Sequence, residues 1–350
     1  MPSHLAHTVF AQDVFRRAGV PWPDTPSGSF AVFGAQGPDI FYHNRRTKPS
    51  GLHYGGLLHR KSYGTFLANA AAYLKRYGNS DRAPGTAGDD ALRYICAAAT
   101  HAVLDRAIHP FINYFAGWHR PGADQIMRFT HAFMERLLDV AVVRRYWEVE
   151  PWEVDFASMF DLGPQMPRLL ERAVRFSLRK TYTRAGRDPI VGRRLANAYA
   201  DARGFYHFTN MIDPVLLKRR MRDGELSTRA LTIIHPPRLP EDIDFLNEEH
   251  RPWTHPCDAT MTRNSSFWEL YDEALEAAGP VVSAIVAAWH RPASSPTEPM
   301  AELIRTAVTD INLSDGLAEN TTCRREHSDP LPFPRFLEEL RGELVDDGPE

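Results

Sequence analysis

Apolar residues recur at helical spacing along most of this chain, and this periodicity constrains its fold more than any other feature. The clearest example is LRYICAAATHAVLDRAIHPF, which begins after Asp89 and Asp90 and is expected to end near Pro110. No run of alternating apolar and polar residues competes with the helical pattern. The sequence therefore predicts an all-α fold built from many helices.

The same spacing predicts further helices joined by connectors rich in Gly and Pro. The expected helical segments are the opening residues up to about 18, with Ser3 as N-cap, and residues 61–77, 126–147, 166–184, 190–222, 264–290 and 298–312. Residues 19–56 are rich in Gly and Pro and indicate an ordered loop, and residues 79–88 a polar turn.

The length of 350 residues suits one large domain or two modest ones. We expect a helical domain over residues 1–235, with a metal site within 1–140, and a C-terminal helical extension over 236–350 packed on it. The formal net charge of −3 gives no general attraction to nucleic acid or acidic membranes.

Cellular location is predicted from what the sequence lacks. No stretch of about 18 apolar residues is present, so no membrane-spanning helix is expected. The first residues do not resemble a secretory signal, which makes a cytoplasmic protein the default interpretation. Cys96, Cys257 and Cys323 lie far apart without C-x-x-C spacing, which argues against a disulfide framework and a thiolate zinc site.

Two imidazole–carboxylate pairs stand one helical turn apart. His101 and Asp105 occur in HAVLD, and His131 and Glu135 occur in HAFME. Residues four apart share one face of a helix, so each pair can converge on one cation, with ligand types that suit zinc. Taken alone, such a pair is more often a solvated surface pair.

Apolar surroundings favour the metal interpretation. Asp105 lies on a helix of apolar residues, where a buried carboxylate needs a partner or a metal. His109 follows one turn later, and nine of the 15 histidines fall within residues 1–135, whereas His235 and five others lie further along the chain. Asp39, between Gly37-Pro38 and an apolar triplet, gives a similar signal, although alone it reads as an ordinary turn aspartate.

Five segments in this order resemble the bacterial zinc-dependent phospholipase C family, whose fold is shared by the S1/P1-type nucleases. They are SHLAHT, GAQGPDIFYH, GLHYGGLLH, HAVLDRAIHP and THAFMERLLD. The specific part is H-x-x-x-D with His soon after, followed by H-x-x-x-E. The match covers roughly residues 1–140 and implies a helical fold of that type and zinc-dependent hydrolysis of phosphoesters.

The resemblance also implies a ligand set drawn from the first 135 residues. Its members are His4, Asp39, His101, Asp105, His109, His131 and Glu135. Asp105 is expected to bridge two zinc ions, and Asp39 to ligate or to act as general base. Either His53 or His59 completes the site: His53 has the better separation from Asp39, and His59, slightly favoured, has the better local context.

One departure from the family affects the number of zinc ions. Secreted members use the amine and carbonyl of an N-terminal tryptophan as ligands, whereas this chain begins Met1-Pro2-Ser3. His7, one turn after His4, is either a replacement ligand or a surface histidine. The site is therefore expected to hold two or three zinc ions.

The predicted reaction is attack on phosphorus by a zinc-activated water that Asp39 orients. Aromatic residues either hold a choline-like or lipid moiety or pack in the core; they are Phe41, Tyr42, Tyr54, Tyr63, Phe66 and Phe111. The expected partner is a small-molecule or phospholipid substrate, with no stable nucleic-acid complex. Two alternatives remain: a single-strand nuclease or phosphodiesterase on the same fold, and a metal-dependent enzyme for a non-lipid small molecule.

Overall fold

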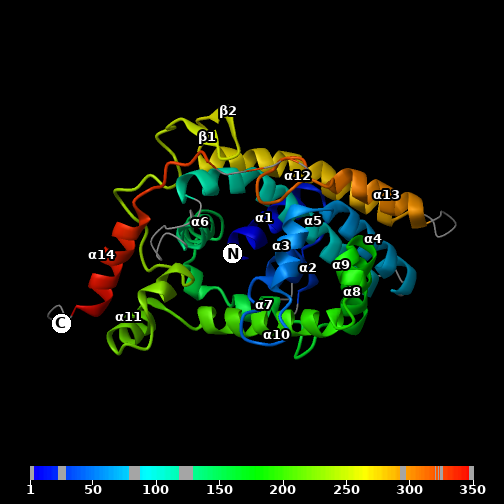
Figure 1. The fold of residues 1–350 in the computed structure, drawn as a ribbon, viewed down its shortest axis with the longest axis horizontal. Coiled ribbons are helices and arrows are strands. Elements are labelled where there is room, and N and C mark those ends of the chain that lie inside the picture. Colours follow the sequence, from blue (N-terminus) through cyan, green and yellow to red (C-terminus); the bar gives the residue numbers. More distant parts are fainter. Residues whose placement is uncertain are drawn as a thin grey trace.

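The computed structural model describes residues 4–22, 29–78, 87–117, 129–291, 297–319, 321, 323 and 326–346. In these ranges it holds fourteen α-helices and one two-stranded sheet (Figure 1). The predicted all-α fold class is confirmed. Ser3, the predicted first N-cap, and most of the predicted turn at 79–88 lie outside the described residues.

The first half of the chain contributes α1 (His4–Arg17), α2 (Phe30–Ala35), η1 (Gly37–Phe41), α3 (Leu52–Arg60), α4 (Tyr63–Tyr77), α5 (Ala87–Phe115), α6 (Thr130–Tyr146), η3 (Pro151–Glu153) and α7 (Phe156–Phe160). The second half contributes α8 (Arg168–Thr181), α9 (Thr183–Gly186), α10 (Val191–Asn210), α11 (Pro214–Arg222), η4 (Thr228–Thr232), β1 (Trp253–His255), β2 (Asp258–Arg263), α12 (Phe267–Trp289), α13 (Thr297–Val308) and α14 (Phe333–Val345).

Helix α5 is the central element and packs against α1, α2, α4 and α12. The predicted end near Pro110 is wrong, because α5 continues through this proline to Phe115. Proline cannot donate to the carbonyl of Arg106 four residues earlier, and Gly316 lies closely against that carbonyl. The last turn stays helical because Phe111 and Phe115 are fully buried there.

The loop predicted over residues 19–56 is in part helical. It contains α2, η1 and α3, and the Ser29 side chain caps α2 by accepting from the Val32 amide. Gly34 has a packing role, since a Cβ there would come within 2.6 Å of the Tyr94 carbonyl oxygen on α5. Glycine thus permits the close approach of α2 and α5. The Gly-rich pattern, which typically indicates a loop, here reflects helix packing.

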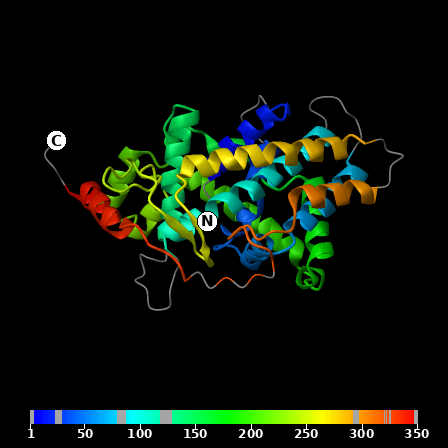
Figure 2. The same ribbon diagram turned by 90° about the horizontal axis from the view of Figure 1, so that it is seen from above.

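The helices after residue 236 cover the first ones. Helix α12 lies along α5, and α13 lies against α4, as both views of the ribbon show (Figures 1 and 2). Helix α14 instead contacts α11 at the other end of the molecule. The predicted helix over 190–222 is two helices, because Asp213 caps α11 and Pro214 occupies its first turn. The boundary between 235 and 236 stays a prediction.

A β-hairpin and a disulfide were not predicted. Strands β1 and β2 pair antiparallel, with Trp253 opposite Arg263. Cys257, in the turn of this hairpin, forms a disulfide with Cys323, 66 residues away in sequence. The expectation of no disulfide is therefore wrong, because α12 and α13 form a long excursion that returns the chain to the hairpin. No helix in the described ranges is long and apolar enough to cross a membrane.

We predict that Phe111→Ala lowers the free energy of unfolding by about 3–5 kcal/mol, because it opens a cavity between α5 and β1. The Phe111 side chain is 0% exposed and its ring lies edge-on to Trp253. Urea titration followed by circular dichroism measures the change. Phe176→Ala is the matched control, since Phe176 is 38% exposed and its loss should cost about 1 kcal/mol or less. Equal losses would contradict the central position of α5.

Candidate metal centre

Imidazole and carboxylate groups from five elements, α1, η1, α3, α5 and α6, meet in one place. Eight of the ten predicted ligands form one continuous cluster: His7, Asp39, His59, His101, Asp105, His109, His131 and Glu135. Within it, three groups have ligand atoms close enough to share an ion. They are His7 with His101 and Asp105, Asp39 with His59 and His101, and His109 with His131 and Glu135.

Asp105 is the centre of the cluster. Its Oδ2 lies 3.1 Å from His101 Nε2 and 3.4 Å from His59 Nε2. Its Oδ1 lies 3.2 Å from His7 Nε2, and His109 Nδ1 is 3.6 Å from Oδ2. One carboxylate therefore lies beside imidazoles from α1, α3 and α5, and its predicted bridging of two zinc ions stays a prediction.

Asp39 and Glu135 mark the two ends of the cluster. Asp39 Oδ1 lies 3.0 Å from His59 Nε2, and its Oδ2 lies 3.7 Å from His101 Nε2. Glu135 Oε1 lies 3.2 Å from His131 Nε2 and 3.6 Å from His109 Nε2. Each end thus combines one carboxylate with two imidazoles, a donor set that zinc accepts.

Backbone carbonyls fix the orientation of three of these rings. The Nδ1 atoms of His59, His101 and His109 donate to the carbonyl oxygens of Gly55, Ala35 and Leu313 at 2.8, 2.9 and 2.8 Å. A carbonyl can only accept, so Nδ1 carries the proton and Nε2 presents its lone pair to the cluster in the neutral ring. Such outer-shell bonding is typical of metal-bound histidine.

The chain around Asp39 is shaped to admit the His101 ring. Gly37 has φ +50°, and a Cβ at this position would lie 2.7 Å from two carbon atoms of that ring. Pro38 opens the short helix η1, which then turns the Asp39 side chain inward. The GPD sequence therefore places one carboxylate against one imidazole, and any larger residue at 37 would displace them.

Neighbouring imidazoles keep the central carboxylate ionised despite its burial. Burial alone would raise the pKa of Asp105, but the adjacent imidazoles of His101 and His109 hold it well below its ordinary value. Burial likewise opposes the charged form of His59, yet Tyr42 and Asp105 raise its pKa well above the usual range. In the metal-free chain the groups therefore balance one another's charge, and a cation competes with protons for the same lone pairs.

Several polar atoms of the cluster lack a hydrogen bond within the described part of the chain. They are His7 Nδ1, His101 Nε2 and Asp105 Oδ2, all in buried residues. Buried polar atoms are nearly always satisfied, so a site that leaves adjacent lone pairs unused fits a ligand that supplies positive charge. The residues present therefore fit a divalent metal.

Two predicted ligands lie elsewhere. His53 points away from Asp39, with its ring 4.0 Å from that of Tyr54, and it lines a separate hollow beside Arg184. Of the two candidates, the structure therefore brings His59 to the cluster. His4 lies one turn from His7 on α1 but belongs to a second group, with Asp139 and His235.

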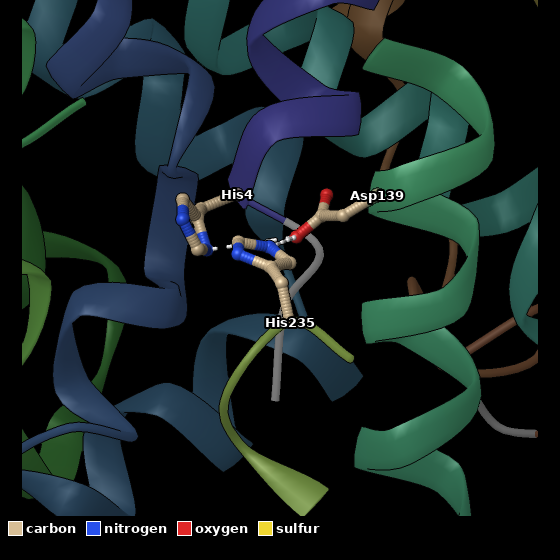
Figure 3. Close-up of side chains that lie close together, drawn as sticks. All are labelled: His4, Asp139 and His235. Carbon is tan, nitrogen blue, oxygen red and sulfur yellow. Dashed lines mark hydrogen bonds and ion pairs between the residues drawn. The ribbon is translucent and has the colours of Figure 1, made fainter. Parts of the chain in front are cut away.

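Figure 3 shows this second group, in which α1, α6 and the segment after η4 each contribute one side chain. Its three ligand atoms are close enough for an ion, but Nη1 of Arg136 lies among them. The Nη1 atom is 2.6 Å from His4 Nδ1, 2.9 Å from Asp139 Oδ2 and 3.4 Å from His235 Nε2. The guanidinium supplies positive charge and donates to His4, and the metal-ligand role of His4 stays a prediction.

Asp139 and His235 were missed by the sequence analysis. Asp139 lies on α6, is 0% exposed and also accepts from the Ala6 amide at 2.8 Å. The burial argument that identified Asp105 applies equally to this aspartate on an apolar helix, so the signal was present. His235, which lies 3.0 Å from Asp139, precedes two prolines in a connector and gives no such signal.

A cavity of about 500 Å³ opens onto one side of the metal-ligand cluster. Asp39, His59, His109, His131 and Glu135 form its floor. The other lining side chains include aromatic and basic residues from the loop after η1, from α10 and from η4; they are Tyr42, Arg45, Arg46, Phe129, Phe205, Phe208, Arg229 and Ile233. A ligand in this cavity would therefore contact any ion held at its floor.

Of the two interpretations of the aromatic residues, core packing holds for most of them. Five of the six predicted residues are buried core residues, Phe41, Tyr54, Tyr63, Phe66 and Phe111. Only Tyr42 of that set lines the cavity. The aromatic wall comes instead from residues of α10 and from Phe129, which no sequence motif indicated.

Comparison with known protein families, with curated proteins and with solved structures finds no match. The resemblance to zinc-dependent phospholipase C therefore stays a prediction that rests on motifs within the chain. What the structure adds is the convergence of the histidine and acidic residues.

We predict that Asp105→Asn removes most of the bound divalent metal, because an amide oxygen is a poor replacement for a bridging carboxylate. Metal content is measured by mass spectrometry of the protein after loading and desalting. Asp13→Asn is the control, since the Asp13 carboxylate lies on α1 and pairs with Arg16. Unchanged metal in the Asp105 variant would contradict the bridging role.

We also predict that Arg136→Met costs about 3–5 kcal/mol of stability, because it leaves Asp139 buried without its cation. Arg144 on the same helix is the matched control: it pairs with Glu150, both side chains are about one-third exposed, and its loss should cost at most about 1 kcal/mol. Thermal and chemical unfolding of both variants measure the difference. A neutral Arg136→Met would mean that the second group binds an external cation.

Proposed function

We propose that this protein is a zinc-dependent hydrolase of phosphoesters, similar in action to phospholipase C. The observation that supports the proposal most is the set of three histidines bonded through Nδ1 to backbone carbonyls, with Nε2 directed at buried carboxylates. This cluster forms the floor of a cavity large enough for a small organic phosphoester.

Zinc is the metal that the donor set favours. Imidazole nitrogen with carboxylate oxygen suits zinc, whereas calcium and magnesium prefer oxygen ligands alone. Asp39, His59, His101 and Asp105 would hold one ion, and His109, His131 and Glu135 a second. His7 with Asp105 offers part of a third position. The proposed site therefore holds two zinc ions, and the ligands for a third ion are less complete.

Bound zinc would supply positive charge for the phosphoryl oxygens and lower the pKa of water toward neutrality. Side chains of the protein would orient the water and accept its proton. Asp39 lies at the cavity edge of the cluster, where its carboxylate can orient a water and accept its proton. Burial raises the pKa of Asp39, but His101 and His59 outweigh this effect and hold it below its ordinary value, which keeps the carboxylate ionised.

The proposal has one competing function on the same site, single-strand nuclease activity. Such an enzyme needs aromatic stacking platforms and a basic groove along the backbone. Phe205, Phe208 and Arg229 line the cavity and meet part of this requirement. The volume of about 500 Å³ suits a small-molecule substrate better than a polymer, so we place the nuclease second.

The predicted cytoplasmic location stays a prediction, and one feature weighs against it. Disulfides persist mainly in oxidising compartments. The Cys257–Cys323 disulfide joins the β-hairpin to the segment that supplies the Leu313 carbonyl to His109. An oxidising compartment would therefore help to keep the metal-binding cluster in place.

We predict that His59→Gln lowers the zinc-dependent hydrolysis of bis(p-nitrophenyl) phosphate by about 100-fold or more, because the variant loses a ligand to the ion beside Asp39. His53→Gln should retain activity within about twofold, since its ring faces away from the cluster. Kinetics with added zinc, and after chelation, measure both effects.

The same assay is extended to a phospholipid panel and to single-stranded DNA. Release of a phosphorylated headgroup would support the lipid assignment, and rapid DNA digestion would favour the nuclease. No turnover of any phosphodiester by the zinc-loaded protein would contradict the proposed hydrolase.

A further inference from the structure

We propose that the cavity selects phosphoesters that carry a second anionic group, a carboxylate or another phosphate, held by Arg45, Arg46 and Arg229. This inference rests on the proposed function and names its substrate class. The inference comes from the arginines that line the same cavity as the metal-ligand floor. No sequence motif indicated this role for them.

The three arginines come from two segments far apart in sequence. Arg45 and Arg46 lie in the loop that follows η1, and Arg229 lies in η4. All three are exposed. Among the described residues, none of the three guanidinium groups forms an ion pair with an acidic side chain. The Arg229 guanidinium lies 4.5 Å from the centre of the Phe129 ring, which holds it at the cavity rim.

The charge of this wall is positive. Apart from Asp39 and Glu135 on the floor, Asp201 is the sole acidic residue among the described lining side chains, so three arginines and one aspartate give +2. Asp201 is already committed, because its oxygens accept from Asn44 Nδ2 at 2.9 Å, from the Thr47 amide at 2.9 Å and from the Thr47 hydroxyl. These bonds fix the loop that carries two of the arginines.

A positive wall disfavours a choline-like group. A quaternary ammonium is held by aromatic faces or acids; Tyr42, Phe205 and Phe208 offer such faces, but the arginines that line the same cavity would repel a cation. Guanidinium groups instead match carboxylate and phosphate oxygens in paired hydrogen bonds. The cavity therefore suits a substrate with one phosphoryl group on the floor and a further anion at the rim.

The remaining wall defines the middle of such a substrate. Phe205, Phe208 and Ile233 are half-buried and line the same cavity as the metal-ligand residues and the arginines. His43 stacks on Phe205 at 4.2 Å and fixes that ring. A short apolar linker between the two anions would contact these side chains.

The test compares two phosphomonoesters with two-carbon tails of opposite charge. Phosphoglycolate ends in a carboxylate and phosphoethanolamine in an ammonium, and ethyl phosphate is the neutral reference. Calorimetric titration of the zinc-loaded protein should show phosphoglycolate binding at least about tenfold more tightly than phosphoethanolamine, the effect of about 1.4 kcal/mol. The triple variant Arg45→Gln, Arg46→Gln, Arg229→Gln should reduce that ratio to below about threefold while the affinity for ethyl phosphate changes little.

The matched control removes three exposed arginines that line none of the described cavities. In the triple variant Arg172→Gln, Arg187→Gln, Arg341→Gln the net charge changes equally, so a retained preference would assign the effect to the rim. Equal binding of the two tails by the native chain, or a preference that survives loss of the rim arginines, overturns the inference. The ratio of the two affinities does not depend on turnover. A protein without hydrolytic activity would therefore contradict the proposed hydrolase, while the measured ratio would still test the preference for a second anionic group.

Discussion

The burial of the Asp105 carboxylate is the constraint on which the rest of this structure depends. A lone ionised carboxylate in an apolar interior costs several kcal/mol, so the fold must surround it with positive charge. Four imidazoles do so, and they come from α1, α3 and two turns of α5. The packing of α1 and α3 around α5 therefore serves one electrostatic requirement, and the helices that cover α5 from outside keep water away from it.

Local sequence predicted the part of this cluster that one helix carries. His101, Asp105 and His109 repeat at four-residue spacing on a helix whose other residues are apolar, so their shared face and burial follow from helical geometry alone. Residues brought in from elsewhere were harder to place. His53 and His59 lie on the same short helix, and only the way α3 packs on η1 decides which of them faces Asp39.

Other features depend on contacts between distant segments, for which a single sequence offers little signal. Cys257 and Cys323 meet because two long helices form a closed excursion between them. Helix α5 passes through Pro110 because buried aromatic residues hold its last turn, whereas the proline by itself indicates an end. Arg136 is the clearest case: the motif around His4 gives no sign that a guanidinium from another helix lies 2.6 Å from its ring.

The two clusters show how one fold can treat similar histidine and acid groups differently. Around Asp139 the guanidinium of Arg136 is part of the chain and supplies positive charge without a bound ion. Around Asp105 the balancing groups are imidazoles, which can release protons and accept a metal in their place. The cluster holds the three carboxylates of Asp39, Asp105 and Glu135, and in the metal-free chain imidazole protons offset part of their formal charge of −3. Two divalent ions would replace those protons and contribute +4, which brings carboxylates and ions together to +1, so metal binding would make the cluster attractive to a phosphoester.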